Sequence, residues 1–256
     1  MIVIEMPPTL SEWLAIALAL VTLGLGLGWF MFPARLMRHV GLAGNQSHPE
    51  AFGEGRSSLA GFALGLPVTA LMFGQPSLHG VLAAGWVVAS IGKLAHVLVD
   101  GGRGRSILIR LAVCVALAAF GLWQHGLPDY QPFMPRTNAD IIPAGVAAIT
   151  ALFGLICLLF PSAALGLMRL QAVEPGAEGE MRGLLAGLYL ASSLGVLAGG
   201  GIFVQLALGA AWGFTAFGRM ISMLSDGANN LFNWLSLLLE LTLAILVVAA
   251  VFGFAG

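Results

Sequence analysis

The chain has 256 residues, of which 59% are hydrophobic and only 9% are Asp, Glu, Lys or Arg. Soluble globular domains carry roughly 25% charged residues, so this composition excludes a soluble fold. The formal net charge of -1 provides no concentrated basic surface, which excludes nucleic acid as a natural partner. Membrane lipids are the partners that such a composition predicts.

Eight mainly apolar stretches use nearly the whole chain and leave no room for a separate catalytic or nucleotide-binding domain. Each is about 20 residues long, which is enough to cross a hydrocarbon core of about 30 Å as a helix. We therefore predict an all-α, polytopic membrane protein with eight transmembrane helices. The expected spans are Ser11–Phe32, Gly55–Phe73, His79–Val99, Ser106–Trp123, Ile141–Phe160, Met181–Gly200, Phe203–Leu224 and Leu231–Phe252.

The basic residues predict the orientation of these helices, because cytoplasmic connections retain positive charge. Arg136 lies at an even-numbered connection, on the other side. All the others flank the odd-numbered connections: Arg35, Arg38, Arg56, Lys93, Arg103, Arg105, Arg110, Arg169, Arg182 and Arg219. Both termini are therefore predicted to lie on the non-cytoplasmic side.

Residues of the two halves match at a constant shift of 126 positions, which indicates a duplicated four-helix unit. The matches include Gly53-Glu54-Gly55-Arg56 with Gly179-Glu180-Met181-Arg182, Leu59-Ala60-Gly61 with Leu185-Ala186-Gly187, Trp86 with Trp212, Gly92-Lys93 with Gly218-Arg219, and Asp100-Gly101 with Asp226-Gly227. We expect one repeat at 1–127, a Pro-rich external linker at 128–140 and a second repeat at 141–256. Four helices per repeat is an even number, so the two four-helix bundles should be related by an axis along the membrane normal.

Four features recur in each half: a first helix ending in Phe-Pro, a Gly-Glu-x-Arg start of the second, a Trp in the third, and a Lys or Arg seven residues before Asp-Gly. With Glu240 in the closing helix, this pattern resembles a bacterial four-helix membrane family classified as a domain of unknown function. It is also similar to the DoxX-like group. Some DoxX-like proteins are associated with quinone-linked redox systems or lipid metabolism, so the resemblance implies a bacterial inner-membrane protein and favours such ligands. The first half departs from the pattern, because Cys114 occupies the position of Glu240.

The repeated charges are candidate ligand-binding residues, because an ionisable group at membrane depth is costly unless it is paired or near the headgroups. In the first half they are Glu54, Arg56, Lys93 and Asp100, and in the second half Glu180, Arg182, Arg219 and Asp226. One interpretation is an ionic latch, repeated in each half, that holds the second helix to the third. The other is a polar pocket for a lipid or quinone head group.

Glu240 is the best single functional candidate, because it lies roughly ten residues into the last helix and is therefore about 13 Å deep. We expect it to face the interior, toward the seventh helix, and it would either pair with Arg219 or stay protonated through desolvation. Trp212, at a matched and deep position, is a further candidate wall residue.

Metal and cofactor sites are not expected. The five histidines, His39, His48, His79, His96 and His125, fall at helix ends or in loops, and none is expected to pair with a Cys or carboxylate at ligand spacing. No catalytic triad, phosphate loop or zinc motif is present. Glycines four residues apart share a helix face and favour close helix packing. The pairs are Gly24 and Gly28, Gly61 and Gly65, Gly183 and Gly187, and Gly209 and Gly213.

Three functions remain open. We favour a protein that binds or carries a hydrophobic small molecule, such as a quinone, isoprenoid or lipid, between its helices. The alternative is a non-catalytic accessory subunit that packs against a larger membrane complex. A membrane enzyme using Glu240 or the edge charges is the third reading, and it lacks a recognised catalytic set.

Overall fold

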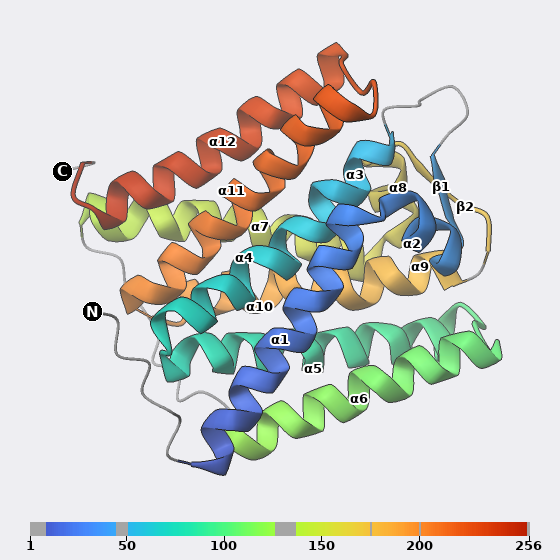
Figure 1. The fold of residues 1–256 in the computed structure, drawn as a ribbon, viewed down its shortest axis with the longest axis horizontal. Coiled ribbons are helices and arrows are strands. Elements are labelled where there is room, and N and C mark those ends of the chain that lie inside the picture. The colour runs from blue at the N-terminus through green and yellow to red at the C-terminus, as the bar shows by residue number, and fades with distance from the viewer. Residues whose placement is uncertain (1–8, 45–50, 126–136, 175, 200, 255–256) are drawn as a thin grey trace.

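A computed structural model describes residues 9–44, 51–125, 137–174, 176–199 and 201–254. Helices form nearly all of this part of the chain, which confirms the all-α class. The start of α1 and the end of α12 lie toward one end of the molecule, and a two-stranded pairing lies toward the other (Figure 1).

The first half of the chain forms α1 (Leu10–Met31), α2 (Pro33–Val40), β1 (Leu42–Gly44), α3 (Phe52–Arg56), α4 (Ser58–Phe73), α5 (Pro76–Val99) and α6 (Arg105–His125). The second half forms α7 (Asn138–Leu159), α8 (Pro161–Leu167), β2 (Leu170–Ala172), α9 (Gly176–Glu180), a π-helical turn (Met181–Leu185), α10 (Ala186–Leu197), α11 (Gly201–Ser225) and α12 (Leu231–Val251). Most of the expected linker, residues 128–136, lies outside the described residues.

Seven helices in the described part of the chain are long and apolar enough to cross a membrane, so the protein is a multi-pass membrane protein. They coincide with seven of the eight expected spans. The remaining stretch, expected at Met181–Gly200, begins with the π-helical turn and continues as α10, a helix of 12 residues. It is therefore too short as a single regular helix to count as a span.

Short elements follow the first long helix of each half, and the sequence analysis did not anticipate them. Pro33 and Pro161 occupy the first positions of α2 and α8, where a missing backbone N–H costs nothing. The following segments form β1 and β2, which pair antiparallel with Ala43 opposite Gln171. This pairing joins the two halves directly.

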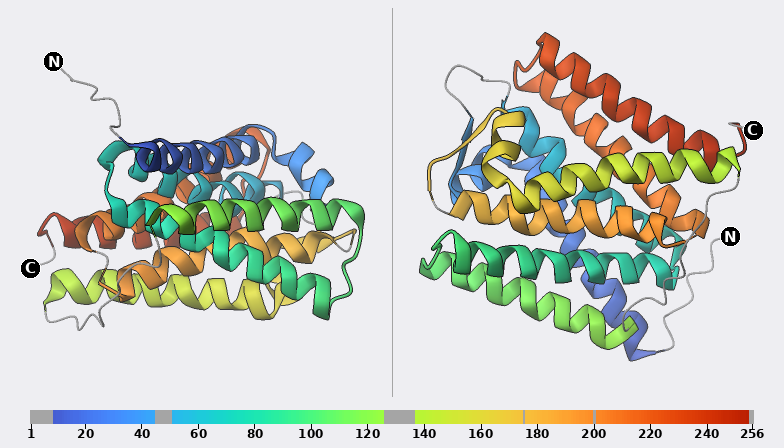
Figure 2. Two further views of the ribbon diagram at one scale, coloured as in Figure 1. Left: turned by 90° about the horizontal axis from the view of Figure 1, so that it is seen from below. Right: turned by 180° about the vertical axis from the view of Figure 1, so that it is seen from behind.

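The long helices pack extensively between the halves as well as within each half. Helix α4 lies against α11, and α5 lies against α10, whereas α4 and α5 contact each other much less. Figure 2 shows α10 running beside α5 on one side and α7 on the other. The second long helix of each half thus packs on the third long helix of the other half, a contact between the expected four-helix units that their sequence did not reveal.

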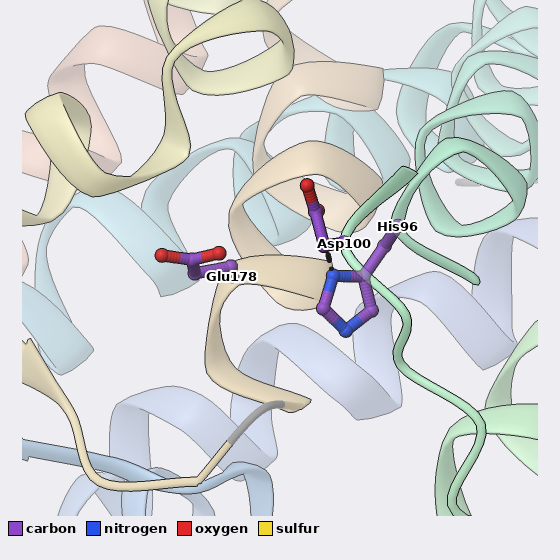
Figure 3. A group of neighbouring side chains, drawn as sticks. All are labelled: His96, Asp100 and Glu178. Atoms are coloured by element: carbon purple, nitrogen blue, oxygen red, sulfur yellow. Dashed lines mark hydrogen bonds and ion pairs between the residues drawn. The ribbon is translucent and has the colours of Figure 1, made fainter. Parts of the chain in front are cut away.

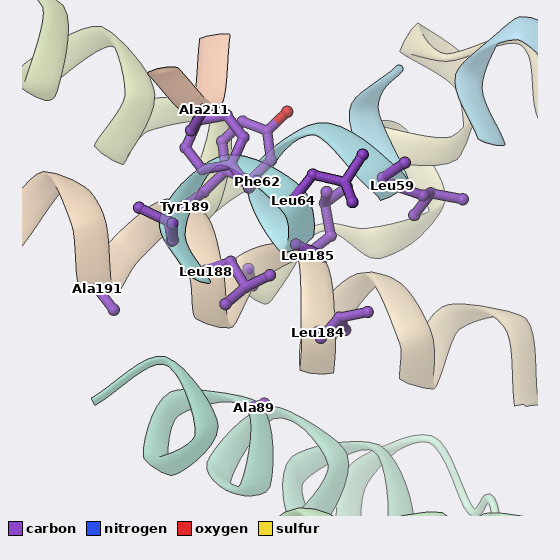
Figure 4. Close-up of a cluster of buried hydrophobic side chains, with 14 of the residues drawn as sticks. Leu59, Phe62, Leu64, Ala89, Leu184, Leu185, Leu188, Tyr189, Ala191 and Ala211 are labelled. Atoms are coloured by element: carbon purple, nitrogen blue, oxygen red, sulfur yellow. The ribbon is translucent and has the colours of Figure 1, made fainter. Parts of the chain in front are cut away.

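Aromatic side chains fill the centre where α4, α10 and α11 meet (Figure 4). The ring of Phe62 stacks on Tyr189 with centroids 4.0 Å apart, and Trp212 meets both rings edge-on. Trp212 also donates its indole N–H to Thr150 at 2.9 Å, as Trp86 does to Thr22 at 3.0 Å. These hydrogen bonds satisfy the polar end of each buried indole.

Glycines allow the helix backbones of the two halves to touch. A Cβ at Gly92 would collide with the carbonyl of Arg182, and a Cβ at Gly218 would collide with the carbonyl of Arg56. Gly61 and Gly187 also lie in close contact, against Thr215 and the Gly85 carbonyl, which confirms their expected packing role. The expectation was wrong for Gly24 and Gly213, because a Cβ there would meet nothing within 4 Å.

We predict that Gly218→Ala destabilises the protein by about 1–3 kcal/mol, because backbone atoms cannot move aside for the added methyl group as a flexible side chain would. Gly213→Ala on the same helix is the control, because a Cβ there meets nothing within 4 Å. Reversible unfolding in detergent measures both variants. Equal stability of the two would contradict the close approach of α11 and the Arg56 backbone.

Candidate functional site

A buried ionic network joins α3, α11 and α12. The Arg219 guanidinium contacts Glu54 at 2.7 Å and Glu240 at 2.7 Å, and it also donates to the side-chain oxygen of Asn233 at 2.8 Å. All four side chains are almost fully buried, with exposed fractions of 4% or less. Glu240 faces the interior toward α11, which confirms that prediction, and of its two expected states the ion pair with Arg219 is the one observed.

Glu54 comes from the other half of the chain, where it lies in the short helix α3. Its carboxylate also accepts a hydrogen bond from the Ser58 hydroxyl at 2.6 Å. The Asn233 side chain donates to the Ala228 carbonyl, and its backbone N–H donates to the side-chain oxygen of Asn230, which caps the start of α12. The network is thus fixed by local structure on three elements.

A second buried pair occupies the matching positions, 126 residues away in each case. Lys93 on α5 contacts Glu180 at 2.6 Å, and Arg110 on α6 approaches the same carboxylate at 3.4 Å. Cys114, at the position that matches Glu240, is buried. Both networks therefore connect a glutamate of one half with a cation of the other, but their charges differ.

Two further ion pairs lie nearer the end of the bundle. Arg56 contacts Asp226 at 2.9 Å, and Arg182 contacts Asp100 at 2.9 Å. Arg56 also donates to the Phe30 carbonyl, as Arg182 does to the Leu158 carbonyl. Each arginine thereby ties the end of its own first long helix to the third long helix of the other half.

The expected latch within each half is corrected by these contacts. A latch within the second half would pair Glu180 or Asp226 with Arg182 or Arg219, but Glu180 pairs with Lys93 and Asp226 with Arg56, both of the first half. The physical reason is the packing of α4 on α11 and of α10 on α5, which brings the charges of opposite halves together.

The backbone is irregular at the start of the second long helix of each half, next to these charged residues. Glu54 and Arg56 are two positions apart, and residues at that spacing point to opposite sides of a regular α-helix. The helix breaks at Ser57, with φ of -90° and ψ of -88°, while the matching stretch of the second half forms the π-helical turn. The irregular turns thus occur where both charged residues contact the same neighbouring helix or its end.

His96, Asp100 and Glu178 form a polar cluster that the sequence analysis missed (Figure 3). His96 and Asp100 are four residues apart, and the His96 Nδ1 lies 2.9 Å from the carboxylate, so the expectation that no histidine pairs with a carboxylate at ligand spacing was wrong. Burial opposes the charge of Asp100, but hydrogen bonds with His96 and Arg182 outweigh it and lower the pKa of this carboxyl. Because Arg182 already neutralises Asp100, we interpret this cluster as part of the Arg182–Asp100 ion pair and not as a metal site.

A cavity of about 230 Å³ opens beside the Arg219 network. Its walls come mainly from α7, α8 and α12, with Tyr189 and Trp212 contributing from α10 and α11. Apart from Glu54, Arg219, Glu240 and the hydroxyls of Ser58 and Ser236, the described lining residues are mostly apolar. Apolar walls with a few convergent polar groups are typical of small-molecule sites.

The candidate residues therefore separate into three groups. Glu240, Arg219, Glu54 and Trp212 line the cavity; Lys93 and Glu180 form the second buried pair; and Arg56, Asp226, Arg182 and Asp100 form the outer ion pairs. The sequence analysis missed Asn233 and Arg110. Asn233 lies seven residues before Glu240 and therefore on the same helix face, which was a usable signal.

Residues 139–251 match a domain of unknown function (DUF4345), which covers the second half of the chain. No curated protein and no solved structure matches the chain. This match agrees with the expected resemblance to a family classified as a domain of unknown function.

We predict that Arg219→Gln destabilises the protein by about 3–5 kcal/mol, because it leaves two buried carboxylates without their counter-charge. Adding Glu54→Gln and Glu240→Gln to that variant should recover much of the loss, since no uncompensated charge then remains. Unfolding in detergent measures the series. A loss below about 1 kcal/mol for the single variant would contradict a desolvated network.

Proposed function

We propose that the protein binds or carries a hydrophobic small molecule, of the quinone, isoprenoid or lipid type, in the cavity between α7, α8 and α12. The observation that carries this proposal is the combination of apolar walls with a buried Arg219, Glu54 and Glu240 network at one end. An amphiphile would place its polar head against the network and its chain along the walls.

The difference between the two buried networks supports a role for this one. Glu240 is replaced by Cys114 at the matching position, and the cavity lies on the Glu240 side. A carboxylate is a costly group in an apolar interior, and intramembrane ionisable groups mark functional sites more often than structural ones. A purely structural network could have used the simpler arrangement of Lys93 and Glu180.

The position of Glu240 also bears on the alternative of an accessory subunit. That alternative gains support if Glu240 faces outward and awaits a partner helix. Its side chain instead lies inside the single chain, 4% exposed and hydrogen-bonded to Arg219. We therefore keep small-molecule binding as the proposal.

We further propose that the chain is a duplicated unit in a bacterial inner membrane, with both termini on the non-cytoplasmic side. The 126-residue spacing between the matching ion pairs supports the duplication. The segment Gly176–Leu197, which runs beside α5 and α7 (Figure 2), would supply the eighth crossing. An even number of crossings places both termini on one side.

Filling the cavity tests the proposed function. Leu239 lines the cavity and is 45% exposed, whereas its neighbour Leu238 is 64% exposed and is not among the lining residues. We expect Leu239→Trp to reduce the amount of co-purifying small molecule at least fivefold, because the larger side chain occupies the space of the ligand. Leu238→Trp is the matched control and should retain it. Mass spectrometry of the native protein and of its organic extract provides the measurement.

Equal retention by Leu239→Trp and Leu238→Trp would contradict binding in this cavity. Recovery of the wild-type protein with no small molecule bound above the level of bulk membrane lipid would contradict the proposed function itself.

A further inference from the structure

We propose that the cavity selects amphiphiles with a cationic head group, such as an alkylammonium. This inference rests on the proposed binding function and narrows its ligand to a lipid-type amphiphile, because the head groups of quinones and isoprenoids carry no positive charge. It follows from the charge of the network, from the hydrogen bonds that are already made, and from the aromatic residues of the wall.

With both carboxylates ionised, the network carries more negative than positive charge. Glu54 and Glu240 are two carboxylates, and Arg219 supplies one guanidinium, while no other charged residue lines the cavity among those described. An uncompensated charge inside an apolar bundle is unfavourable. A cationic head group would restore neutrality, whereas an anionic head group would add to the excess.

Arg219 has no donor left for an anionic ligand. Its Nε donates to Glu240, its Nη1 to Glu54 and Asn233, and its Nη2 to Glu54 and Glu240. These bonds use all five N–H groups of a guanidinium. A phosphate or carboxylate would therefore have to displace an existing charge-assisted hydrogen bond before it could bind.

Glu240 keeps acceptor capacity that Glu54 has largely used. Glu54 accepts two hydrogen bonds from Arg219, one from the Ser58 hydroxyl and a longer one of 3.5 Å from the Ser57 hydroxyl, whereas Glu240 accepts three, all from Arg219. An ionised carboxylate offers about four lone-pair sites. Glu240 can thus receive a positive head group without giving up Arg219.

Aromatic rings line the same space and favour a cation further. Phe153, Tyr189, Trp212 and Phe232 all contribute to the cavity wall. The face of an aromatic ring attracts a cation within about 6 Å, and clusters of such rings recognise quaternary ammonium groups. Phe232 already contacts a cation of the chain itself, because the Arg169 guanidinium lies 4.1 Å from its ring centroid, so this ring is not counted toward the head-group site.

The matching site of the first half has the opposite charge balance. Arg110 stands at the position of Ser236, and Cys114 stands at the position of Glu240. Glu180 there faces both Lys93 and Arg110. An arginine at position 236 should therefore add the positive charge that the first half has in Arg110. This substitution removes the excess of negative charge at the cavity.

The test measures binding of three probes that share a ten-carbon chain: decyltrimethylammonium, decanol and decanoate. The full chain is held in nanodiscs of zwitterionic phosphatidylcholine, and calorimetric titration is corrected with Leu239→Trp nanodiscs. We expect decyltrimethylammonium to bind at least tenfold more tightly than decanol, and decanoate to bind most weakly.

Ser236→Arg should abolish the preference for the ammonium, because residues 236 and 240 are four apart on α12 and the new guanidinium can pair with Glu240. Glu240→Gln provides a second route should the first variant fail to fold, and should bring ammonium and decanol within about twofold. Cys114→Ala, at the matching position outside the cavity lining, is the control and should keep the preference.

Tighter or equal binding of decanol or decanoate by the wild-type protein would overturn the inference while leaving the binding function intact. An unchanged ammonium preference in both Ser236→Arg and Glu240→Gln would overturn it as well. Wild-type protein that binds none of the three probes would overturn the proposed binding function together with this inference.

Discussion

A charge enclosed by apolar helices must meet an opposite charge, and this constraint organises the whole bundle. Glu54 meets Arg219, and Glu180 meets Lys93, so the second long helix of each half is held against the third of the other. Close contact is then required, and Gly92 and Gly218 provide it by letting backbone atoms touch next to each cation. The ion pairs and the glycines are therefore parts of one arrangement.

The same constraint explains why the two buried networks can differ in role. Lys93, Arg110 and Glu180 contain more positive than negative charge, whereas Arg219, Glu54 and Glu240 contain more negative charge. The negative network borders the cavity, where a cationic ligand can offset its excess of negative charge. In the proposed account, one network serves mainly to join the halves, and the other joins them and also binds.

The helices and the charged positions could be predicted from the sequence, because apolar length and the recurrence at 126 positions are visible in it. Lys93 and Arg219 were correctly identified as members of ionic networks, and Glu240 as an inward-facing partner of Arg219. The choice of partner could not be predicted for Glu54 or Glu180. In a sequence with matching halves, pairing within a half and pairing between halves satisfy the same charges, and only helix packing decides between them.

Other features depended on three-dimensional context. The cavity arises from the placement of α7, α8 and α12, and α8 is too short and apolar to be distinguished from the helix that precedes it in the sequence. The β1 and β2 strands have three residues each and pair across 128 positions, which leaves no local signal. The helix spacing of Asn233 with Glu240, and of His96 with Asp100, is visible in the sequence. The arginines that contact these groups, Arg219 and Arg182, lie on other elements and could not be assigned from it.

The central claim is that the charges pair between the halves, and a comparison of two double-mutant cycles tests it most directly. One cycle couples Arg56 with Asp226, its partner across the halves, and the other couples Arg56 with Asp100 of its own half, each residue being changed to Ala. The account predicts a coupling energy of about 1–3 kcal/mol for Arg56 with Asp226 and less than about 0.5 kcal/mol for Arg56 with Asp100. Strong coupling of Arg56 to Asp100 together with none to Asp226 would contradict it.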